Sequence, residues 1–233
     1  MSVKISPSII GGTFSNMEKI ISDINKSKAE YIHFDVMDGD FVPNLTFGPK
    51  FISELRNFSD KIFDVHLMIN RVEKFLDEYI NAGSDVITFH CEINEDLKKI
   101  ITKIKKGGIN CGLAIKPKTP WTQIKPYLNF VDQIIIMTVE PGFGGQEFMN
   151  DQVDKIKYIS DYVKENDLNV NIEIDGGINY ETGKICVDAG ADILVAGSFL
   201  FNQGDLITAT NKLSDNFNCW GKMQLYQFLI KLI

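Results

Sequence analysis

Short apolar segments alternate with amphipathic segments along the whole chain. The first kind is rich in β-branched and aromatic residues, as in Tyr31-Ile32-His33-Phe34 and Asp85-Val86-Ile87-Thr88-Phe89. The second kind repeats apolar residues at helical spacing, as in Phe75, Tyr79 and Ile80. Strands that alternate with helices predict βαβ units and a parallel sheet. Eight such pairs within 233 residues predict an α/β fold, a single (β/α)8 TIM barrel. An open doubly wound sheet is the alternative, but it would usually have fewer strands or a longer chain.

The spacing of the segments predicts where each element begins. We expect strands to begin near Val3, Tyr31, Ile62, Asp85, Ile109, Gln133, Val170 and Asp192. We expect helices to begin near Ser15, Pro49, Arg71, Asn94, Pro120, Asp151, Asn179 and Gln203. No linker divides the chain, so residues 1–218 should form one barrel domain. For the apolar tail, residues 219–233, the sequence leaves an additional helix, an interface element and a disordered segment as alternatives.

Charge and composition narrow the range of partners. The net charge is −7, which argues against a nucleic-acid surface. No run of about 20 apolar residues predicts a membrane span. The four cysteines form no C-x-x-C pair and no signal peptide is visible, so we expect reduced thiols and a cytoplasmic protein. An anionic ligand remains compatible with this charge, because backbone N–H groups and helix N-termini supply local positive potential.

Histidines and aspartates fall at the predicted carboxyl ends of three strands. His33 and Asp35 share one face of the second strand, because side chains alternate, while His66 ends the third strand and Asp175 the seventh. The active-site groups of a barrel come from these strand ends. A single histidine here would more often be structural, but two imidazoles and two carboxylates together predict a site for a divalent metal such as Zn²⁺ or Fe²⁺.

Other polar and sulfur-containing side chains also lie at strand ends. His90 ends the fourth strand; we expect no acidic partner for it and assign it a structural or a supporting role outside the ligand set. Met37, Met68 and Met137 end the second, third and sixth strands. Methionine commonly fills gaps in a core, but beside carboxylates it would also form an uncharged wall that excludes water. Both interpretations of these methionines stay open.

Glycine-rich turns follow the last three predicted strands. Their sequences are Pro141-Gly142-Phe143-Gly144-Gly145-Gln146, Asp175-Gly176-Gly177 and Ala196-Gly197-Ser198. Glycine lets backbone N–H groups approach a ligand, and barrels often bind phosphate at their last strands. One such turn would be weak evidence, since tight turns need glycine anyway. Three in succession predict a phosphate site that needs no lysine.

Longer motifs are distributed over all the predicted strands. They read Ser6-Pro7-Ser8-Ile9, His33-Phe34-Asp35-Val36-Met37-Asp38-Gly39, Phe41-Val42-Pro43-Asn44-Leu45-Thr46-Phe47-Gly48, Asp64-Val65-His66-Leu67-Met68, Gly112-Leu113-Ala114-Ile115-Lys116-Pro117, Met137-Thr138-Val139-Glu140-Pro141-Gly142-Phe143-Gly144-Gly145-Gln146 and Asp175-Gly176-Gly177-Ile178. In this order they resemble the ribulose-phosphate 3-epimerase family, from residue 3 to residue 216. Two positions depart from the family pattern: Asp40 stands where His is expected, and Lys118 where Gly is expected.

The resemblance implies a barrel of the ribulose-phosphate-binding type and a reaction. The enzyme would interconvert D-ribulose 5-phosphate and D-xylulose 5-phosphate, a step of the pentose phosphate pathway, through a metal-stabilised 2,3-enediolate. It would carry one divalent metal ion per chain, with Zn²⁺ as first choice and Fe²⁺, Mn²⁺ or Co²⁺ as alternatives. The implied ligands are His33, Asp35, His66 and Asp175, and the two aspartates would also form the acid/base pair.

The resemblance also implies how the substrate is held. Ser8, His66 and Asp175 would contact the sugar, and the phosphate would lie against Gly142, Phe143, Gly144, Gly145, Gly176, Gly177, Gly197 and Ser198. We expect a homodimer, with a hexamer as the alternative, and neither a nucleic-acid nor a membrane partner.

Three other functions remain open from the sequence. An epimerase of the same mechanism could act on a six-carbon ketose phosphate. A metal-independent barrel, such as a relative of orotidine-phosphate decarboxylase, would need a lysine among the carboxylates, and no Asp-x-Lys-x-x-Asp stretch is present. A non-catalytic binding barrel would have no need for both Asp35 and Asp175.

Overall fold

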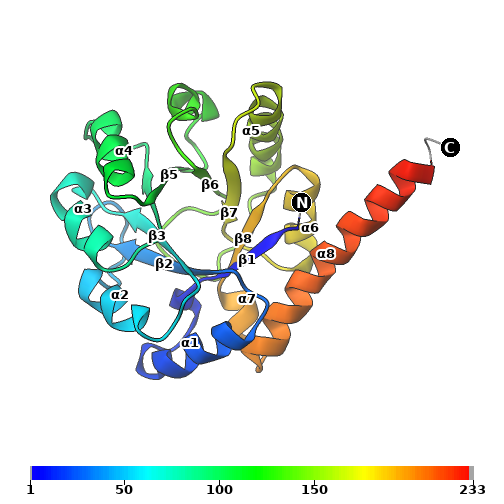
Figure 1. Ribbon diagram of the computed structural model, residues 1–233, viewed down its shortest axis with the longest axis horizontal. Helices are drawn as coiled ribbons and strands as arrows, with labels where there is room; N and C mark the ends of the chain where they lie inside the picture. Colours follow the sequence, from blue (N-terminus) through cyan, green and yellow to red (C-terminus); the bar gives the residue numbers. More distant parts are fainter. Residues whose placement is uncertain (1, 231–233) are drawn as a thin grey trace.

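Eight parallel strands form a barrel with the helices arranged around its outside (Figure 1). The computed structural model describes residues 2–230, with side chains described as far as residue 218. The strands are β1 Lys4–Pro7, β2 Tyr31–Met37, β3 Ile62–Met68, β4 Val86–His90, β5 Asn110–Ile115, β6 Gln133–Met137, β7 Asn171–Asp175 and β8 Ile193–Ala196. Each begins within one residue of its predicted position, and the TIM-barrel prediction is confirmed.

The barrel closes almost completely. Continuous parallel ladders run from β2 through β3 to β8 and then to β1. At the remaining seam, Ser8 and His33 form a parallel bridge, and the N–H of Glu30 donates to the carbonyl of Ile5 at 3.3 Å. The carboxyl ends of all eight strands therefore surround one mouth.

The helices are α1 Met17–Lys26, α2 Pro49–Arg56, α3 Val72–Asn81, α4 Leu97–Lys106, α5 Val153–Glu165, α6 Tyr180–Asp188, α7 Ser198–Phe201 and α8 Leu206–Ile230. The helix predicted near Pro120 is wrong. Two 3₁₀ turns, Trp121–Gln123 and Lys125–Tyr127, stand in its place. The cause is Pro126, which lacks an N–H and would collide with the carbonyl of the preceding helical turn.

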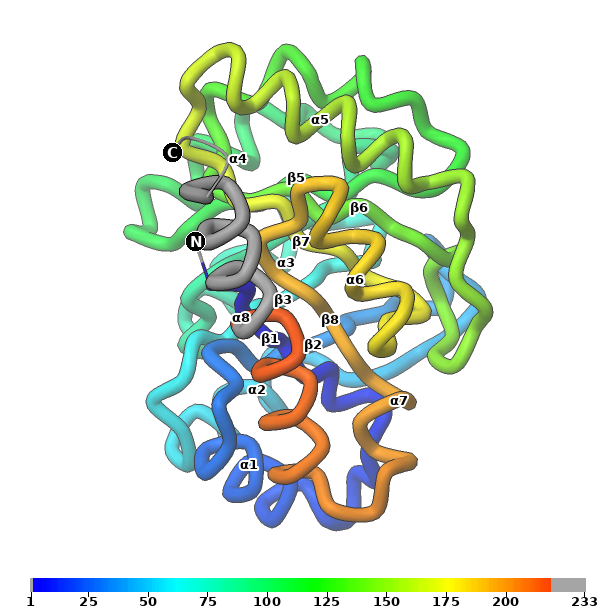
Figure 2. The backbone as a smooth tube through the Cα atoms, turned by 90° about the vertical axis from the view of Figure 1, so that its right-hand side faces the viewer, coloured from blue at the N-terminus to red at the C-terminus, as the bar shows by residue number. Residues whose placement is uncertain are grey.

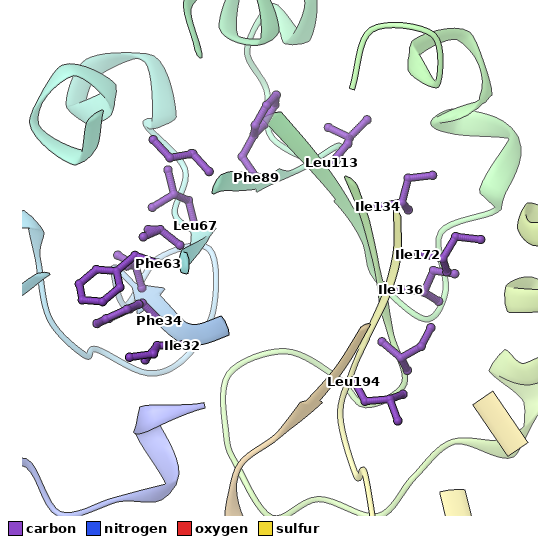
Figure 3. Close-up of a cluster of buried hydrophobic side chains, with 14 of the residues drawn as sticks. Ile32, Phe34, Phe63, Leu67, Phe89, Leu113, Ile134, Ile136, Ile172 and Leu194 are labelled. Carbon is purple, nitrogen blue, oxygen red and sulfur yellow. The ribbon is translucent and has the colours of Figure 1, made fainter. Parts of the chain in front are cut away.

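The main hydrophobic core lies between the strands and the surrounding helices (Figure 3). Alternation along β2 explains how one strand serves two environments. Ile32 and Phe34 point outward into this core, whereas His33 and Asp35 belong to the barrel interior. The outward residues fix the strands against the helices, and the inward residues are free for chemistry.

The barrel interior is layered, and its middle layer is polar. Tyr31, Val86 and Ile193 fill the amino-terminal end. Above them lie four fully or almost fully buried polar side chains: His33, Asp64, Gln133 and Glu173. Buried polar groups need partners, so this layer directs hydrogen bonds toward the mouth.

The last helix connects the end of the chain to its beginning. Figure 2 shows α1 and the first part of α8 side by side. The N–H of Val3 donates to Oδ1 of Asn218 at 3.0 Å, which ties α8 to the start of β1. The division between residues 218 and 219 stays a prediction, because the side chains of the tail lie outside the described residues. Within residues 2–230, no helix is long and apolar enough to span a membrane.

Candidate active site

A cavity of about 290 Å³ opens at the carboxyl ends of the strands. Every predicted site residue lines it except His33 and His66, whose rings are buried beneath its floor. The lining residues that were predicted are Ser8, Asp35, Met37, Met68, Met137, Gly142, Phe143, Gly144, Gly145, Asp175, Gly176, Gly177, Gly197 and Ser198. The structure thus brings together at one place residues that are widely separated in the sequence.

Four side chains converge at the floor of the cavity: two carboxylates that line it and two imidazoles buried beneath. Nε2 of His33 lies 3.4 Å from Oδ1 of Asp35 and 3.9 Å from Oδ2 of Asp175. Nδ1 of His66 lies 3.6 Å and 3.5 Å from the same two oxygens. All four donor atoms lie within 4.8 Å of one another. The residues come from β2, β3 and β7, which are far apart in the sequence.

The donor set fits a divalent cation. Nε2 of His33 and Nδ1 of His66 are buried and, among the described residues, have no hydrogen-bond partner. Buried polar atoms are normally satisfied, so two unpartnered ring nitrogens facing two carboxylates call for a group that accepts lone pairs. Two imidazoles and two carboxylates suit Zn²⁺ and other divalent transition metals.

The electrostatics of this cluster are strongly coupled. Burial alone would lower the pKa of His33, but the adjacent Asp35 and Asp64 outweigh it and raise that pKa. Burial would raise the pKa of Asp35, but the two histidines outweigh it and hold that pKa below its usual range. A cation that binds here would compete with protons for the same ring nitrogens, so the imidazoles are neutral in the cation-bound state.

The sequence prediction missed the residues beneath His33. Nδ1 of His33 lies 2.6 Å from Oδ2 of Asp64, and Nε2 of Gln133 donates to Oδ1 of Asp64 at 3.0 Å. Gln133 also donates to Glu173, whose pKa is raised well above its usual range by burial and by the charge of Asp64. A signal existed: Asp64 and Glu173 each precede a predicted ligand by two residues and so share its face.

The expectation that His90 has no acidic partner is wrong. Its Nδ1 lies 3.0 Å from Oε2 of Glu92, and its Nε2 lies 2.9 Å from Nε2 of His66. Glu92 follows the end of β4, so strand alternation does not govern the direction of its side chain. Burial lowers the pKa of His90 to about 4. Burial opposes ionisation of Glu92, but hydrogen bonds from His90, Thr119 and the backbone of Lys116 lower its pKa to about 2.

Two of the glycines that line the cavity, Gly176 and Gly177, leave no room for side chains. Gly176 and Gly177 have φ of +124° and +65°. A Cβ on Gly176 would lie 2.6 Å from Val139, and one on Gly177 would lie 2.8 Å from backbone atoms of Phe148. A Cβ on Gly144 or Gly145 would make only an ordinary contact, 3.4 Å from Oγ of Ser198. The turns after β6, β7 and β8 therefore meet at the cavity, where their glycines present backbone.

Ser8 and the methionines complete the wall. The hydroxyl of Ser8 donates to Oδ2 of Asp35, which leaves Oδ1 of that carboxylate facing the histidines.

Met37, Met68 and Met137 are almost fully buried and still line the cavity. They pack in apolar clusters and also form the uncharged surface beside the carboxylates, so the two interpretations of the methionines are compatible.

Sequence comparison gives the relatives of the chain. The model of the ribulose-phosphate 3 epimerase family matches residues 4–201. The ribulose-phosphate 3-epimerase of Bacillus subtilis is 38% identical over 212 residues, covering 91% of this chain and 98% of that protein. The ribulose-phosphate 3-epimerase of Rhodobacter capsulatus is 41% identical over 207 residues, covering 89% and 90%.

Structural comparison finds the same barrel in more distant proteins. KGPDC from Streptococcus mutans has a TM-score of 0.67 and 15% identity, covering 93% of this chain and 98% of that chain. Orotidine 5′-phosphate decarboxylase from Pyrococcus horikoshii has a TM-score of 0.66 and 15% identity, covering 91% and 98%. At this identity the likeness concerns the fold alone. The sequence relatives decide the family: the chain belongs to the ribulose-phosphate 3-epimerase family and is an isomerase of that family.

Proposed function

We propose that the protein is a metal-dependent epimerase that interconverts D-ribulose 5-phosphate and D-xylulose 5-phosphate. One observation carries this proposal: two carboxylates and two unpartnered imidazole nitrogens converge at a cavity that three glycine-rich turns also line. The four side chains suit proton transfer beside a ketone. The three glycine-rich turns, here called the glycine cradle, suit a phosphate. A pentulose 5-phosphate presents these two groups at opposite ends.

His33, Asp35, His66 and Asp175 are the residues that would hold the metal, one ion per chain. When bound, the ion would stabilise negative charge on the oxygens next to the reacting carbon. Zn²⁺ is the first choice for this donor set, and Fe²⁺, Mn²⁺ and Co²⁺ are alternatives. Asp64 supports the site because its carboxylate accepts the Nδ1 hydrogen of His33 and so leaves the Nε2 lone pair toward the centre.

Asp35 and Asp175 are the proposed acid/base pair. Inversion at carbon 3 needs a base on one face of the carbon and an acid on the other, with an enediolate between the two steps. Asp35 comes from β2 and Asp175 from β7, with β1 and β8 between them around the barrel. One carboxylate would remove the carbon 3 proton, and its partner would return a proton on the opposite face. The hydroxyl of Ser8 fixes the orientation of Asp35.

The glycine cradle would bind the phosphate through backbone N–H groups. Gly144, Gly145, Gly176, Gly177, Gly197 and Ser198 line the cavity. Binding energy from the phosphate can then position carbon 3 between the carboxylates. The methionine wall excludes water from the carboxylates while they are exchanging protons.

We also propose a cytoplasmic homodimer, with a hexamer as the alternative. The support for the compartment is that Cys91, Cys111 and Cys186 are free thiols, as is usual in reducing compartments. The support for the oligomer is the family resemblance alone. Sedimentation of the purified chain measures its mass in solution directly.

Replacement of Asp175 by asparagine tests the two-base mechanism. The variant keeps an oxygen in the position of the metal ligand but loses proton transfer on one face. Asp35 should still exchange the carbon 3 proton of one epimer with solvent deuterium. Conversion to the other epimer should fall by about 10²- to 10⁴-fold. Metal content is measured in the same sample. Equal loss of exchange and epimerisation with metal still bound would remove support for two separate bases.

A further inference from the structure

We propose that Glu92 is a positioning residue that acts on His66 through His90, and so fixes which nitrogen of His66 carries a hydrogen. The inference rests on the proposed metal site, because the contacts of Glu92 and His90 would leave the Nδ1 lone pair of His66 facing that site. Glu92 lies outside the cavity lining, and its part in the site is indirect.

The three side chains form a continuous line of polar contacts. Oε2 of Glu92 lies 3.0 Å from Nδ1 of His90, and Nε2 of His90 lies 2.9 Å from Nε2 of His66. The two rings are inclined by only 24°, with centroids 5.0 Å apart. With the nitrogens at 2.9 Å, this arrangement is nearly edge to edge, as an in-plane N–H···N hydrogen bond requires. Both rings are fully buried, so water does not interrupt the line.

The direction of these hydrogen bonds follows from the carboxylate. An ionised carboxylate only accepts, so Nδ1 of His90 must carry the hydrogen. A neutral imidazole has one N–H, which leaves Nε2 of His90 as an acceptor. Nε2 of His66 must then donate to it. The remaining nitrogen of His66, Nδ1, is left with its lone pair toward Asp35 and Asp175, where it has no hydrogen-bond partner among the described residues.

The orientation of Glu92 is itself fixed by backbone. Its Oε1 accepts the N–H of Lys116 at 2.7 Å and also the hydroxyl of Thr119. The N–H of Lys116 can only donate, so whatever atom faces it must be an oxygen. A glutamine at position 92 would therefore turn its oxygen toward Lys116 and its NH₂ toward His90. That NH₂ donates to Nδ1 of His90, so Nε2 of His90 must carry the hydrogen and donate to Nε2 of His66. The hydrogen of His66 then lies on Nδ1.

Glu92→Gln should therefore have an effect out of proportion to its size. The variant has the same shape and retains the contact with Lys116. In this variant, however, Nδ1 of His66 presents an N–H, not a lone pair, to the proposed metal site. Loss of a residue that orients a metal-binding histidine commonly weakens metal binding by about 10- to 100-fold. On the other side of the centre, Asp64 contacts His33 directly, whereas Glu92 reaches His66 only through His90.

The first test needs no metal. The chain has three histidines, so a ¹⁵N-histidine spectrum resolves each ring and reports which nitrogen is protonated. In the unaltered protein His90 should be protonated at Nδ1, and in Glu92→Gln at Nε2. Glu165→Gln, at the exposed end of α5, is the matched control and should leave all three rings unchanged. Protonation of His90 at Nε2 in the unaltered protein would overturn the proposal.

The second test measures zinc affinity by competition with a chelator. Glu92→Gln should bind Zn²⁺ about 10- to 100-fold more weakly than the unaltered protein or Glu165→Gln. In a His90→Gln background, where the amide oxygen can accept from His66, Glu92→Gln should have no further effect. Equal weakening in both backgrounds would contradict action through His90. Failure of the unaltered protein to bind zinc would contradict the metal site, whereas normal zinc binding without the His90 switch would contradict only the role of Glu92.

Discussion

Replacement of Gly177 by alanine should damage both the stability of the barrel and the phosphate end of the cavity. Gly177 has a φ of +65°, and a Cβ there would lie 2.8 Å from both Cα and N of Phe148. Phe148 is buried, and the N–H of the next residue, Met149, donates to the carbonyl of Thr138 at 2.9 Å. The turn after β7 therefore presses on a loop that is anchored to the end of β6.

Two separate costs add in this variant. An alanine in the left-handed region costs about 1–2 kcal/mol. Forcing a methyl group against fixed backbone costs about a further 1–3 kcal/mol. The free energy of unfolding should therefore fall by about 2–5 kcal/mol. Gly108→Ala is the matched control, because Gly108 has a φ of +75° but a Cβ added there would meet nothing within 4 Å. It should lose only about 1–2 kcal/mol.

Urea denaturation of the two variants separates the cost of the left-handed backbone from the cost of the contact with Phe148. The KM for D-ribulose 5-phosphate measures how well the glycine turns still bind the phosphate. Displacement of one hydrogen bond to the charged phosphate should raise KM by about 10-fold or more in Gly177→Ala. Gly108 lies at the opposite end of the barrel, before β5, so its replacement should leave KM unchanged. Equal destabilisation of both variants would refute the close approach to Phe148 as the reason for glycine. An unchanged KM in Gly177→Ala would refute the part of this turn in holding the phosphate.

Other perturbations test the remaining parts of the site and the fold. Asp64→Asn should weaken zinc binding by about 10- to 100-fold in a chelator competition, because His33 loses its carboxylate partner; unchanged affinity would speak against that role. Unphosphorylated ribulose should lose kcat as well as affinity, because the phosphate positions the reacting carbon; equal kcat for the two sugars would contradict this. Asp38 has its pKa lowered, since three backbone N–H groups outweigh the effect of burial. Its contribution to stability should be present above its unfolded pKa of about 4 and lost as pH falls through the lowered folded value. Asp38→Asn should therefore destabilise the protein at pH 7, with a difference from the unaltered protein that shrinks in acid unfolding experiments.

The strands could be predicted because each is a short apolar run with clear ends, and counting them indicated the barrel. The rule that catalytic groups lie at strand ends then placed His33, Asp35, His66 and Asp175 together before any contact was known. The glycine turns were found for the same reason. Local pattern and global fold agree at these positions, which is why sequence alone sufficed.

Other features depend on information that the pattern does not carry. The helix expected near Pro120 is absent because the proline at position 126 breaks a segment whose apolar spacing is otherwise helical. Asp64 and Glu173 could have been found by alternation, but strand interiors are usually assumed to be apolar. The contact of Glu92 with His90 was out of reach, since it depends on how the chain turns after β4 and on the backbone of Lys116.

Epimerisation by this protein should depend on a metal held by His33, Asp35, His66 and Asp175. The most direct measurement combines elemental analysis with a coupled assay on D-ribulose 5-phosphate before chelation, after chelation and after metal is restored. We expect near one divalent transition metal per chain, activity that falls with the metal content, and recovery when the ion is returned. A preparation that is fully active without any such metal would contradict the proposed metal dependence.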